Sequence, residues 1–353
     1  MKKRIQPLDG LRAIAAFGVV WIHVWTFYGN PSLVLFTTDV YKLVAILGNG
    51  VDFFFVISGF CMYLMIDKQY TVKRYLAFLK KRFLRIAPAF YVSVLVYAGI
   101  VQFNHPSFPF WYNVFFHFLF LNNVVTGNSI SAPFWSIGTE WHFYLLLPFL
   151  VYLSRNFSLV KTVVFFSFTS LSFFFIINTG HLSYDWWEPQ ILVRFPEFGA
   201  GILCAYCYLK AIKIPSPFRG ISGLLSGFLV MYLGRLLKVQ FVLYHAGSLA
   251  PFLKTIADTI MCTGFAFILY HVITQPSVVA SLLGANQITY LGRISYSIYL
   301  WHSLVIYLIS PFLLKLTFGV LNPIAGFLCT GIITVVIAHF SYQLFEAFYF
   351  KRK

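Results

Sequence analysis

The first long apolar stretch of the chain, residues 8–28, reads LDGLRAIAAFGVVWIHVWTFY. It is long enough to cross a lipid bilayer as one helix, yet it contains Arg12 and His23, which such helices normally exclude. The two residues are eleven positions apart, so at about 3.6 residues per turn both side chains project from one face, about 16 Å apart along the axis. This spacing predicts a polar track from one membrane surface into the bilayer. A structural alternative is open for each residue: Arg12 can extend to the lipid headgroups, and His23 can hydrogen-bond a neighbouring helix.

The amino-acid composition is that of an integral membrane protein. Of the 353 residues, 59% are hydrophobic, 20% are aromatic and only 10% are charged, whereas soluble domains contain about 25% charged residues. The formal net charge is +16, but the basic residues lie in short loops between apolar runs, as expected where Lys and Arg set membrane orientation. We therefore exclude nucleic acid as a partner. The sequence contains no metal-ligand cluster and no glycine-rich phosphate loop.

Ten apolar stretches predict an all-α, polytopic membrane bundle that forms a single domain over residues 1–353. The stretches are residues 8–28, 43–66, 86–103, 134–153, 162–178, 191–209, 219–236, 254–272, 292–311 and 324–346. Of the 26 Lys and Arg residues, 20 fall on the side that holds both ends of the chain and 6 fall on the other side. The positive-inside rule then predicts that both termini are cytoplasmic. The predicted location is the cell inner (plasma) membrane, as a multi-pass protein.

Two further titratable residues lie inside these stretches. Glu140 is an acid within a membrane helix, which by default indicates a functional group. Counted from opposite membrane faces, His23 and Glu140 both lie about 21–22 Å above the inner face, so the two side chains are able to meet. His302 lies near the middle of the ninth stretch, where it either lines a site or bridges two helices.

Polar and small residues near the outer ends of other stretches suggest structural contacts. Asp52 follows glycines that can break the second helix, so we expect it at the outer mouth or within the span. Ser58 and Gly59 are small neighbours of the kind that let membrane helices approach closely. Arg194 and Glu197 are three positions apart, which predicts an internal ion pair.

A basic pair lies at the inner membrane boundary. Arg82 and Arg85 are three positions apart and therefore share a helix face. One interpretation is attraction to anionic membrane lipids, and this is what the charge alone favours. The other is a clamp for a phosphorylated cytoplasmic ligand, because paired guanidinium groups suit phosphate oxygens.

Five stretches carry a resemblance that covers nearly the whole chain. They are LDGLR (residues 8–12) followed by His23, GVDFFFVISGF (50–60), RFLRIAP (82–88), FWSIGTEWHFYLLLP (134–148) and GRISYSIYLWH (292–302). In this order they resemble the motifs of the acyltransferase-3 family of membrane O-acyltransferases. One departure is Trp141 and His142 after Glu140, where Glu-Gln is usual in the family. This departure bears on substrate contacts more than on chemistry.

The resemblance implies an activity and the roles of four residues. The family moves acyl groups, commonly acetyl from cytoplasmic acetyl-CoA, onto hydroxyls of extracytoplasmic sugars. It makes Arg12 and His23 the essential pair of the first helix, and Arg82 and Arg85 the essential basic pair. No fused extracytoplasmic domain is expected. Transfer would therefore be completed by the membrane domain or by a separate partner, such as an envelope-polysaccharide assembly protein.

These features together predict a membrane O-acyltransferase that uses acyl-CoA, commonly acetyl-CoA, and no metal. Arg82 and Arg85 would hold the CoA phosphates, and the pantetheine arm would pass Arg12. His23 would remove a proton from the acceptor hydroxyl, and Glu140 would orient His23 or stabilise its imidazolium. An acyl-histidine intermediate is equally compatible with the sequence. The remaining candidate substrate-binding residues are Asp52, Ser58, Trp135, Tyr144 and His302.

Two other functions compete with this one. A transporter of an acyl donor or of an acylated saccharide would use the same polar track without bond chemistry, and it would release no free CoA. A structural subunit of an envelope-polysaccharide machine would need none of the polar residues for activity.

Overall fold

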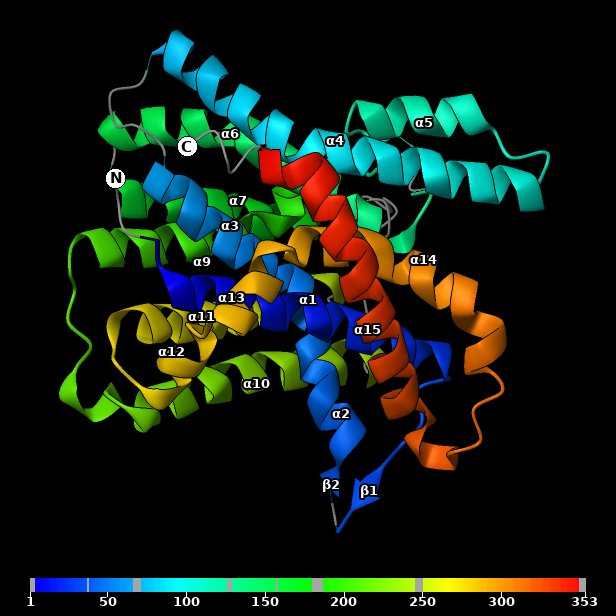
Figure 1. Cartoon of the computed structure of the whole chain (residues 1–353). Helices are drawn as coiled ribbons and strands as arrows, with labels where there is room; N and C mark the ends of the chain where they lie inside the picture. The colour runs from blue at the N-terminus through cyan, green and yellow to red at the C-terminus, as the bar shows by residue number, and fades with distance from the viewer. Residues whose placement is uncertain are drawn as a thin grey trace.

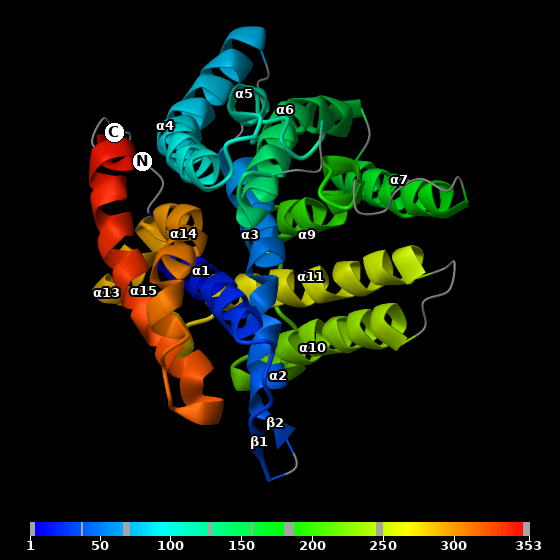
Figure 2. The same cartoon turned by 90° about the vertical axis from the view of Figure 1, so that its right-hand side faces the viewer.

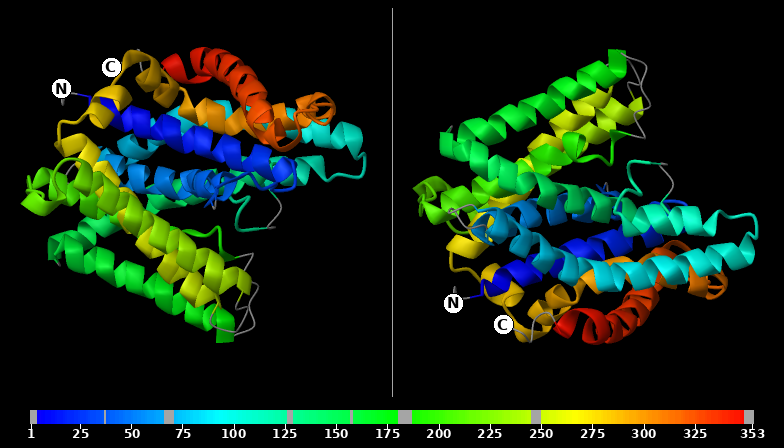
Figure 3. Two further views of the ribbon diagram at one scale, coloured as in Figure 1. Left: turned by 90° about the horizontal axis from the view of Figure 1, so that it is seen from below. Right: turned by 90° about the horizontal axis from the view of Figure 1, so that it is seen from above.

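The computed structural model describes residues 4–36, 38–65, 71–125, 129–156, 158–179, 187–244 and 250–348. The axes of most long helices are roughly parallel or antiparallel, and the start of α1 lies at the same end of the bundle as the end of the last helix (Figures 1 and 3). The helical elements in chain order are α1 (Gln6–Phe27), α2 (Val40–Val44), η1 (Ala45–Asn49), α3 (Gly50–Met65), α4 (Val72–Asn104), α5 (Phe110–Phe118), η2 (Ala132–Phe134), α6 (Trp135–Asn156), α7 (Leu159–Thr179), α9 (Ile191–Leu209), η3 (Ser216–Phe218), α10 (Ile221–Tyr244), α11 (Ala250–Thr274), α12 (Val278–Leu283), α13 (Asn286–Arg293), α14 (Ser295–Leu313), η4 (Gly319–Leu321), α15 (Asn322–Ser341) and η5 (Tyr342–Glu346). A short antiparallel hairpin, β1 (Val34–Leu35) and β2 (Thr38–Asp39), follows α1.

The predicted all-α membrane bundle is confirmed. Within the described ranges, eight helices are long and apolar enough to cross a membrane. They are Gln6–Phe27, Val40–Met65, Val72–Asn104, Ile191–Leu209, Ile221–Val239, Phe252–Thr274, Ser295–Leu313 and Gly319–Glu346. The other two predicted spans, at 134–153 and 162–178, form α6 and α7. These helices have 22 and 21 residues, which at about 1.5 Å per residue also span a hydrocarbon core of about 30 Å.

The third span begins earlier than predicted. A basic loop was expected before it, whereas α4 is one helix of 33 residues. Its start is capped, because the Thr71 side chain accepts a hydrogen bond from the backbone N–H of Arg74. Lys and Arg are good helix formers, so the helix extends about four turns beyond its apolar part. Arg82 and Arg85 therefore lie on one continuous helix.

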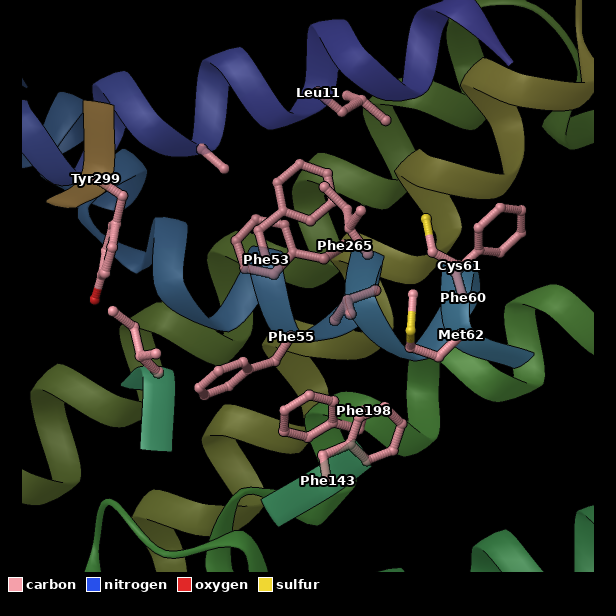
Figure 4. Packing of buried hydrophobic residues seen from close by; sticks show 14 of the residues in the cluster. Leu11, Phe53, Phe55, Phe60, Cys61, Met62, Phe143, Phe198, Phe265 and Tyr299 are labelled. Carbon is pink, nitrogen blue, oxygen red and sulfur yellow. The ribbon is translucent and has the colours of Figure 1, made fainter. Parts of the chain in front are cut away.

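Helix α3 lies at the centre of the bundle. In Figure 2 it runs between α1 and α14 on one side and α6, α9 and α11 on the other, and it contacts α1, α6, α9 and α11. Aromatic rings fix these contacts. The ring of Phe55 stacks on that of Phe198 with centroids 4.5 Å apart, and Phe53 stacks on Phe265 at 4.6 Å (Figure 4).

Two glycines bring α3 and α9 into direct backbone contact. A Cβ atom on Gly59 would lie 2.2 Å from the Phe198 carbonyl oxygen, and one on Gly201 would lie 2.0 Å from the Val56 carbonyl oxygen. No side chain fits at either position, so the predicted close approach at the Ser58–Gly59 pair is confirmed. The approach holds the Asp52 end of α3 against the start of α9.

Candidate active site

A narrow pocket with a cavity volume of about 80 Å³ lies between α1, α3, α4, α6 and α14. We call it the central pocket and define it by its polar lining residues. These are Arg12, Ser58, Arg85, Ser136, Glu140, Tyr144, Ser295, Tyr296 and Tyr299. Val51 and Met62 of α3 also line it, and their spacing of eleven residues gives the pocket a length of about 16 Å. It therefore extends through about half the hydrocarbon thickness.

Glu140 lies in the wall of this pocket with two hydroxyl groups. Ser58 Oγ donates to Glu140 Oε1 at 2.8 Å, and the Tyr144 hydroxyl donates to the same oxygen. Tyr144 is one helical turn from Glu140 on α6, so the two side chains share a face, whereas Ser58 reaches across from α3. The three residues join α3 to α6 beside the central pocket.

Positive charge gathers at one end of the central pocket. Arg12 lies there, with Nη2 3.6 Å from Cys61 Sγ and Nη1 4.0 Å from Asp9 Oδ1. Arg85 lines the same end and lies within electrostatic range of both Arg12 and Arg82. This end is the cytoplasmic one in the predicted orientation.

Arg82 is buried without a full set of partners. Only 3% of the residue is exposed, and its Nη2 atom lies 2.8 Å from Met65 Sδ. Its guanidinium carbon lies 5.6 Å from the centre of the Phe78 ring. Nε and Nη1 have no hydrogen-bond partner in the described part of the chain. Buried guanidinium groups are normally paired, so these two nitrogens are suited to an anionic ligand.

His23 and His302 form a pair at the other end of the first helix. His302 is fully buried, and its Nδ1–H donates to the Tyr299 carbonyl oxygen at 2.7 Å. His23 Nδ1 lies 2.8 Å from the Val19 carbonyl oxygen and 3.3 Å from His302 Nε2. Because carbonyl oxygens only accept, each Nδ1 carries a proton. In the neutral pair, His302 Nε2 is then an acceptor for His23 Nδ1–H, and the basic lone pair of His23 is on Nε2.

The histidine pair adjoins the outer end of the central pocket. Tyr299, whose carbonyl oxygen binds His302, also lines the pocket. On the other side, a Cβ atom on Gly50 would meet Val19, which lies one helical turn below His23. In Figure 4, Tyr299 and Met62 lie towards opposite ends of α3. Arg12 is the α1 residue that lines the central pocket, and neither His23 nor His302 is among its lining residues.

The expected pairing of Glu140 with His23 is not what the structure contains. The hydrogen bonds of Glu140 go to Ser58 and Tyr144, and those of His23 go to Val19 and His302. The estimate from the sequence gave only the depth of each side chain in the membrane. In the structure His23 bonds to α14, whereas Glu140 bonds to α3. Of the five candidate substrate-binding residues, Ser58 and Tyr144 line the central pocket.

Asp52 lies outside the central pocket, in an ion-pair cluster. Its Oδ1 is 3.2 Å from Arg194 Nη1, and its Oδ2 accepts from Asn49 Nδ2 at 2.8 Å. Arg194 also pairs with Glu197 at 2.9 Å, which confirms the predicted ion pair, and with Glu188 at 3.1 Å. These contacts join α3 to α9, so a structural ion pair explains why Asp52 is buried here.

The ion-pair cluster extends to α10 and α11 through pairs that the sequence reasoning did not predict. Lys254 pairs with Glu188, and Lys238 pairs with Asp258 at 2.6 Å. Burial alone would raise the pKa of the Glu188 carboxyl, but the charges of Arg194 and Lys254 outweigh it and lower this pKa to about 2. The signal in the sequence was the presence of single charges of opposite sign in apolar spans, which need partners in a membrane.

Comparison with known proteins decides the family. The sequence profile described as "Acyltransferase domain" matches residues 5–342. The chain belongs to the acyltransferase-3 family. This acyltransferase is 27% identical over 315 residues to the ORF330 protein of Acidianus two-tailed virus, covering 86% of the chain and 84% of the viral protein. No solved structure matches it.

The acyltransferase also resembles two bacterial proteins. It is 25% identical over 341 residues to the peptidoglycan O-acetyltransferase OatA of Listeria monocytogenes, covering 88% of the chain and 51% of the relative. It is 24% identical over 370 residues to the O-acetyltransferase OatA of Staphylococcus aureus, covering 96% of the chain and 56% of the relative. The chain spans about half the length of these OatA proteins.

The site of this membrane acyltransferase combines three chemical functions. The arginines at one end can bind anions, the pocket extends for about 16 Å, and the histidine pair carries a basic nitrogen behind Tyr299 at the other end. Within the described residues, no group of three or more His, Cys, Asp or Glu side chains could hold a metal ion.

Proposed function

We propose that this acyltransferase transfers an acyl group, most simply acetyl, from cytoplasmic acyl-CoA to a hydroxyl of a cell-surface or lipid-linked saccharide. The single observation that carries the proposal is the central pocket, which has Arg12 and Arg85 at one end and, at the other, Tyr299, whose carbonyl oxygen binds His302. A donor with phosphates at one end and a thioester at the other has the shape that such a pocket accommodates. The plasma membrane is the proposed location, with both termini in the cytoplasm.

The donor end of the proposal rests on Arg82, Arg85 and Arg12. Arg82 has two unpaired buried nitrogens, and phosphate oxygens would satisfy both at once. Arg85 and Arg12 line the pocket beyond it, so the pantetheine arm would pass them on its way outward. The pocket continues for about 16 Å, which brings the thioester towards His23.

The chemical step rests on His23. The acceptor hydroxyl oxygen attacks the thioester carbonyl carbon, and its proton moves to His23 Nε2, which carries the basic lone pair. The carbon–sulfur bond then breaks, and the CoA thiolate takes up the proton from the imidazolium. The acyl-histidine alternative uses the same nitrogen as nucleophile, and both routes require Nδ1 to stay protonated.

His302 and Glu140 take supporting roles in this proposal. His302 Nε2 accepts from His23 Nδ1–H, so it holds the imidazole ring with Nε2 free and shares the positive charge of the imidazolium. Glu140 fixes the hydroxyls of Ser58 and Tyr144 in the pocket wall and balances the charge of Arg12, with which it interacts electrostatically. We therefore assign both residues to positioning.

Release of free CoA tests the proposal. Purified full-length protein in nanodiscs is incubated with acetyl-CoA and a saccharide acceptor, and free thiol and acetyl ester are both measured. Transfer should produce equal amounts of both, and Arg82→Ala should raise the KM for acetyl-CoA. A transporter would release no CoA. If no CoA is released, acyl transfer is not the function and transport takes its place. Lys80 is exposed on the same helix as Arg82, so Lys80→Ala is the matched charge control.

A further inference from the structure

A second pocket opens near the start of α6 and α9. It has a cavity volume of about 360 Å³, within the range of about 300–1,000 Å³ that is usual for small-molecule sites. We call it the outer pocket and define it by six of its lining residues. These are Asn122, Ser129, Ala132, Trp135, Glu188 and Arg194. It lies away from the arginine end of the central pocket.

Three lining residues of the outer pocket, Asn122, Asn123 and Ser129, carry buried acceptor atoms without a partner among the described residues. Asn122 Nδ2 donates to the Phe134 carbonyl oxygen at 3.1 Å, and this bond fixes the orientation of the amide. Asn122 Oδ1 then has no partner, and neither does Ser129 Oγ, among the described residues. Buried polar atoms are nearly always satisfied. Unsatisfied acceptors at a pocket wall indicate a ligand that donates, as hydroxyl groups do.

The rest of the wall is rigid and suited to the same ligand. The Glu188 side chain is 29% exposed, and its carboxylate is held by Arg194 at 3.1 Å and by Lys254. The guanidinium carbon of Arg194 lies 5.0 Å from the Trp135 ring centre, which holds the indole in place. A fixed carboxylate beside an aromatic ring offers one surface for hydroxyl groups and one for the apolar carbon–hydrogen face of a sugar ring.

The outer pocket and the central pocket lie on opposite sides of a packed aromatic pair. The Trp135 ring lies 6.0 Å from the Phe55 ring, edge to face. Phe55 lines the central pocket, as does Ser136, the neighbour of Trp135. The Ser136 hydroxyl in turn lies 2.7 Å from the Tyr299 hydroxyl. The two pockets are thus separated by the packed side chains of Trp135 and Phe55.

We propose that the outer pocket binds the acceptor, a neutral saccharide, and presents its hydroxyl across Trp135 to the central pocket. This proposal rests on the proposed acyl transfer for its role but not for its binding chemistry. The thioester of the donor then enters from the cytoplasmic side and the acceptor hydroxyl from the outer side, so neither substrate has to cross the membrane.

Two tryptophan substitutions test the site. Ala132 is exposed and lines the outer pocket, so Ala132→Trp places an indole in the pocket without disturbing the core. Val125 lies seven positions earlier in the chain and is also exposed, but it does not line the outer pocket. Val125→Trp is therefore the matched control. Binding of maltotetraose and of the N-acetylglucosamine tetrasaccharide is measured by saturation-transfer NMR on full-length protein in nanodiscs, with thermal unfolding as the fold check.

We expect at least one tetrasaccharide to bind the wild type and Val125→Trp, and its signal to fall to background in Ala132→Trp. Ser129→Ala, which removes one hydroxyl, should weaken binding about 2- to 10-fold and decides the case if Ala132→Trp fails to fold. Binding that is absent from the wild type, or unchanged in folded Ala132→Trp, overturns the site. If the wild type binds the sugar there but releases no CoA from acetyl-CoA, the acyl-transfer proposal falls and the saccharide site remains.

Discussion

Substitution of His302 by leucine separates positioning from chemistry at the histidine pair. His302 is fully buried and contacts His23 through Nε2 at 3.3 Å. Leucine has a similar size and no acceptor, so His302→Leu removes the hydrogen bond without opening a large cavity. Glutamine can keep an acceptor oxygen at this place, so His302→Gln is the conservative partner variant.

The expected loss follows from what His23 retains. In His302→Leu the Val19 carbonyl oxygen, 2.8 Å away, still accepts from His23 Nδ1, so Nε2 keeps its lone pair. One neutral hydrogen bond contributes about 0.5–1.5 kcal/mol, which corresponds to about a 2- to 12-fold fall in kcat. Removal of the base itself in His23→Ala should cost about 10²- to 10⁴-fold. His302→Gln should recover most of the loss.

The assay is acetyl transfer by purified protein in nanodiscs, with kcat and the KM for acetyl-CoA fitted separately. A purely structural His302 would lower the unfolding temperature and leave turnover per folded molecule unchanged. Positioning predicts the opposite pattern: kcat falls, KM for the donor stays constant, and His302→Gln restores kcat. A fall of more than 100-fold in folded His302→Leu would refute the reasoning, because His302 would then take part in the chemistry.

Three further predictions concern the donor end, the ion-pair cluster and the helix contacts. Arg85→Ala should raise the KM for acyl-CoA about 10- to 150-fold, because it removes one charge-assisted hydrogen bond. Lys80→Ala should leave this KM unchanged. An unchanged KM in both variants would indicate that Arg85 contacts lipid instead of the donor. Glu188 has a pKa lowered to about 2, so its ionised form stabilises the fold above about pH 4.5 and this contribution is lost as pH falls towards 2. Glu188→Gln should therefore lower the unfolding temperature at pH 7 and flatten its acid dependence; an identical pH profile would contradict this. Gly59→Ala should cost about 1–3 kcal/mol of stability through overpacking, whereas Gly99→Ala, with nothing within 4 Å of its Cβ, should be neutral by thermal unfolding.

The sequence by itself determined the properties that depend on local pattern. Long apolar runs predicted the membrane class and the approximate positions of the ten long spans, because every backbone polar group inside a bilayer must bond within its own helix. The spacing of Arg194 and Glu197 predicted their ion pair, because residues three apart on a helix are neighbours whatever surrounds them. The motifs alone also indicated the acyltransferase-3 family.

The tertiary structure alone decided which helices meet, and so which side chains form pairs. His302, 279 positions from His23, takes the place that depth had suggested for Glu140, and Glu140 bonds instead to Ser58, 82 positions away. A membrane helix is apolar on all sides, so its sequence does not show which face contacts which neighbour. The same reason hid the partner of Asp52 and the outer pocket, because both form only where α3, α6 and α9 are packed together.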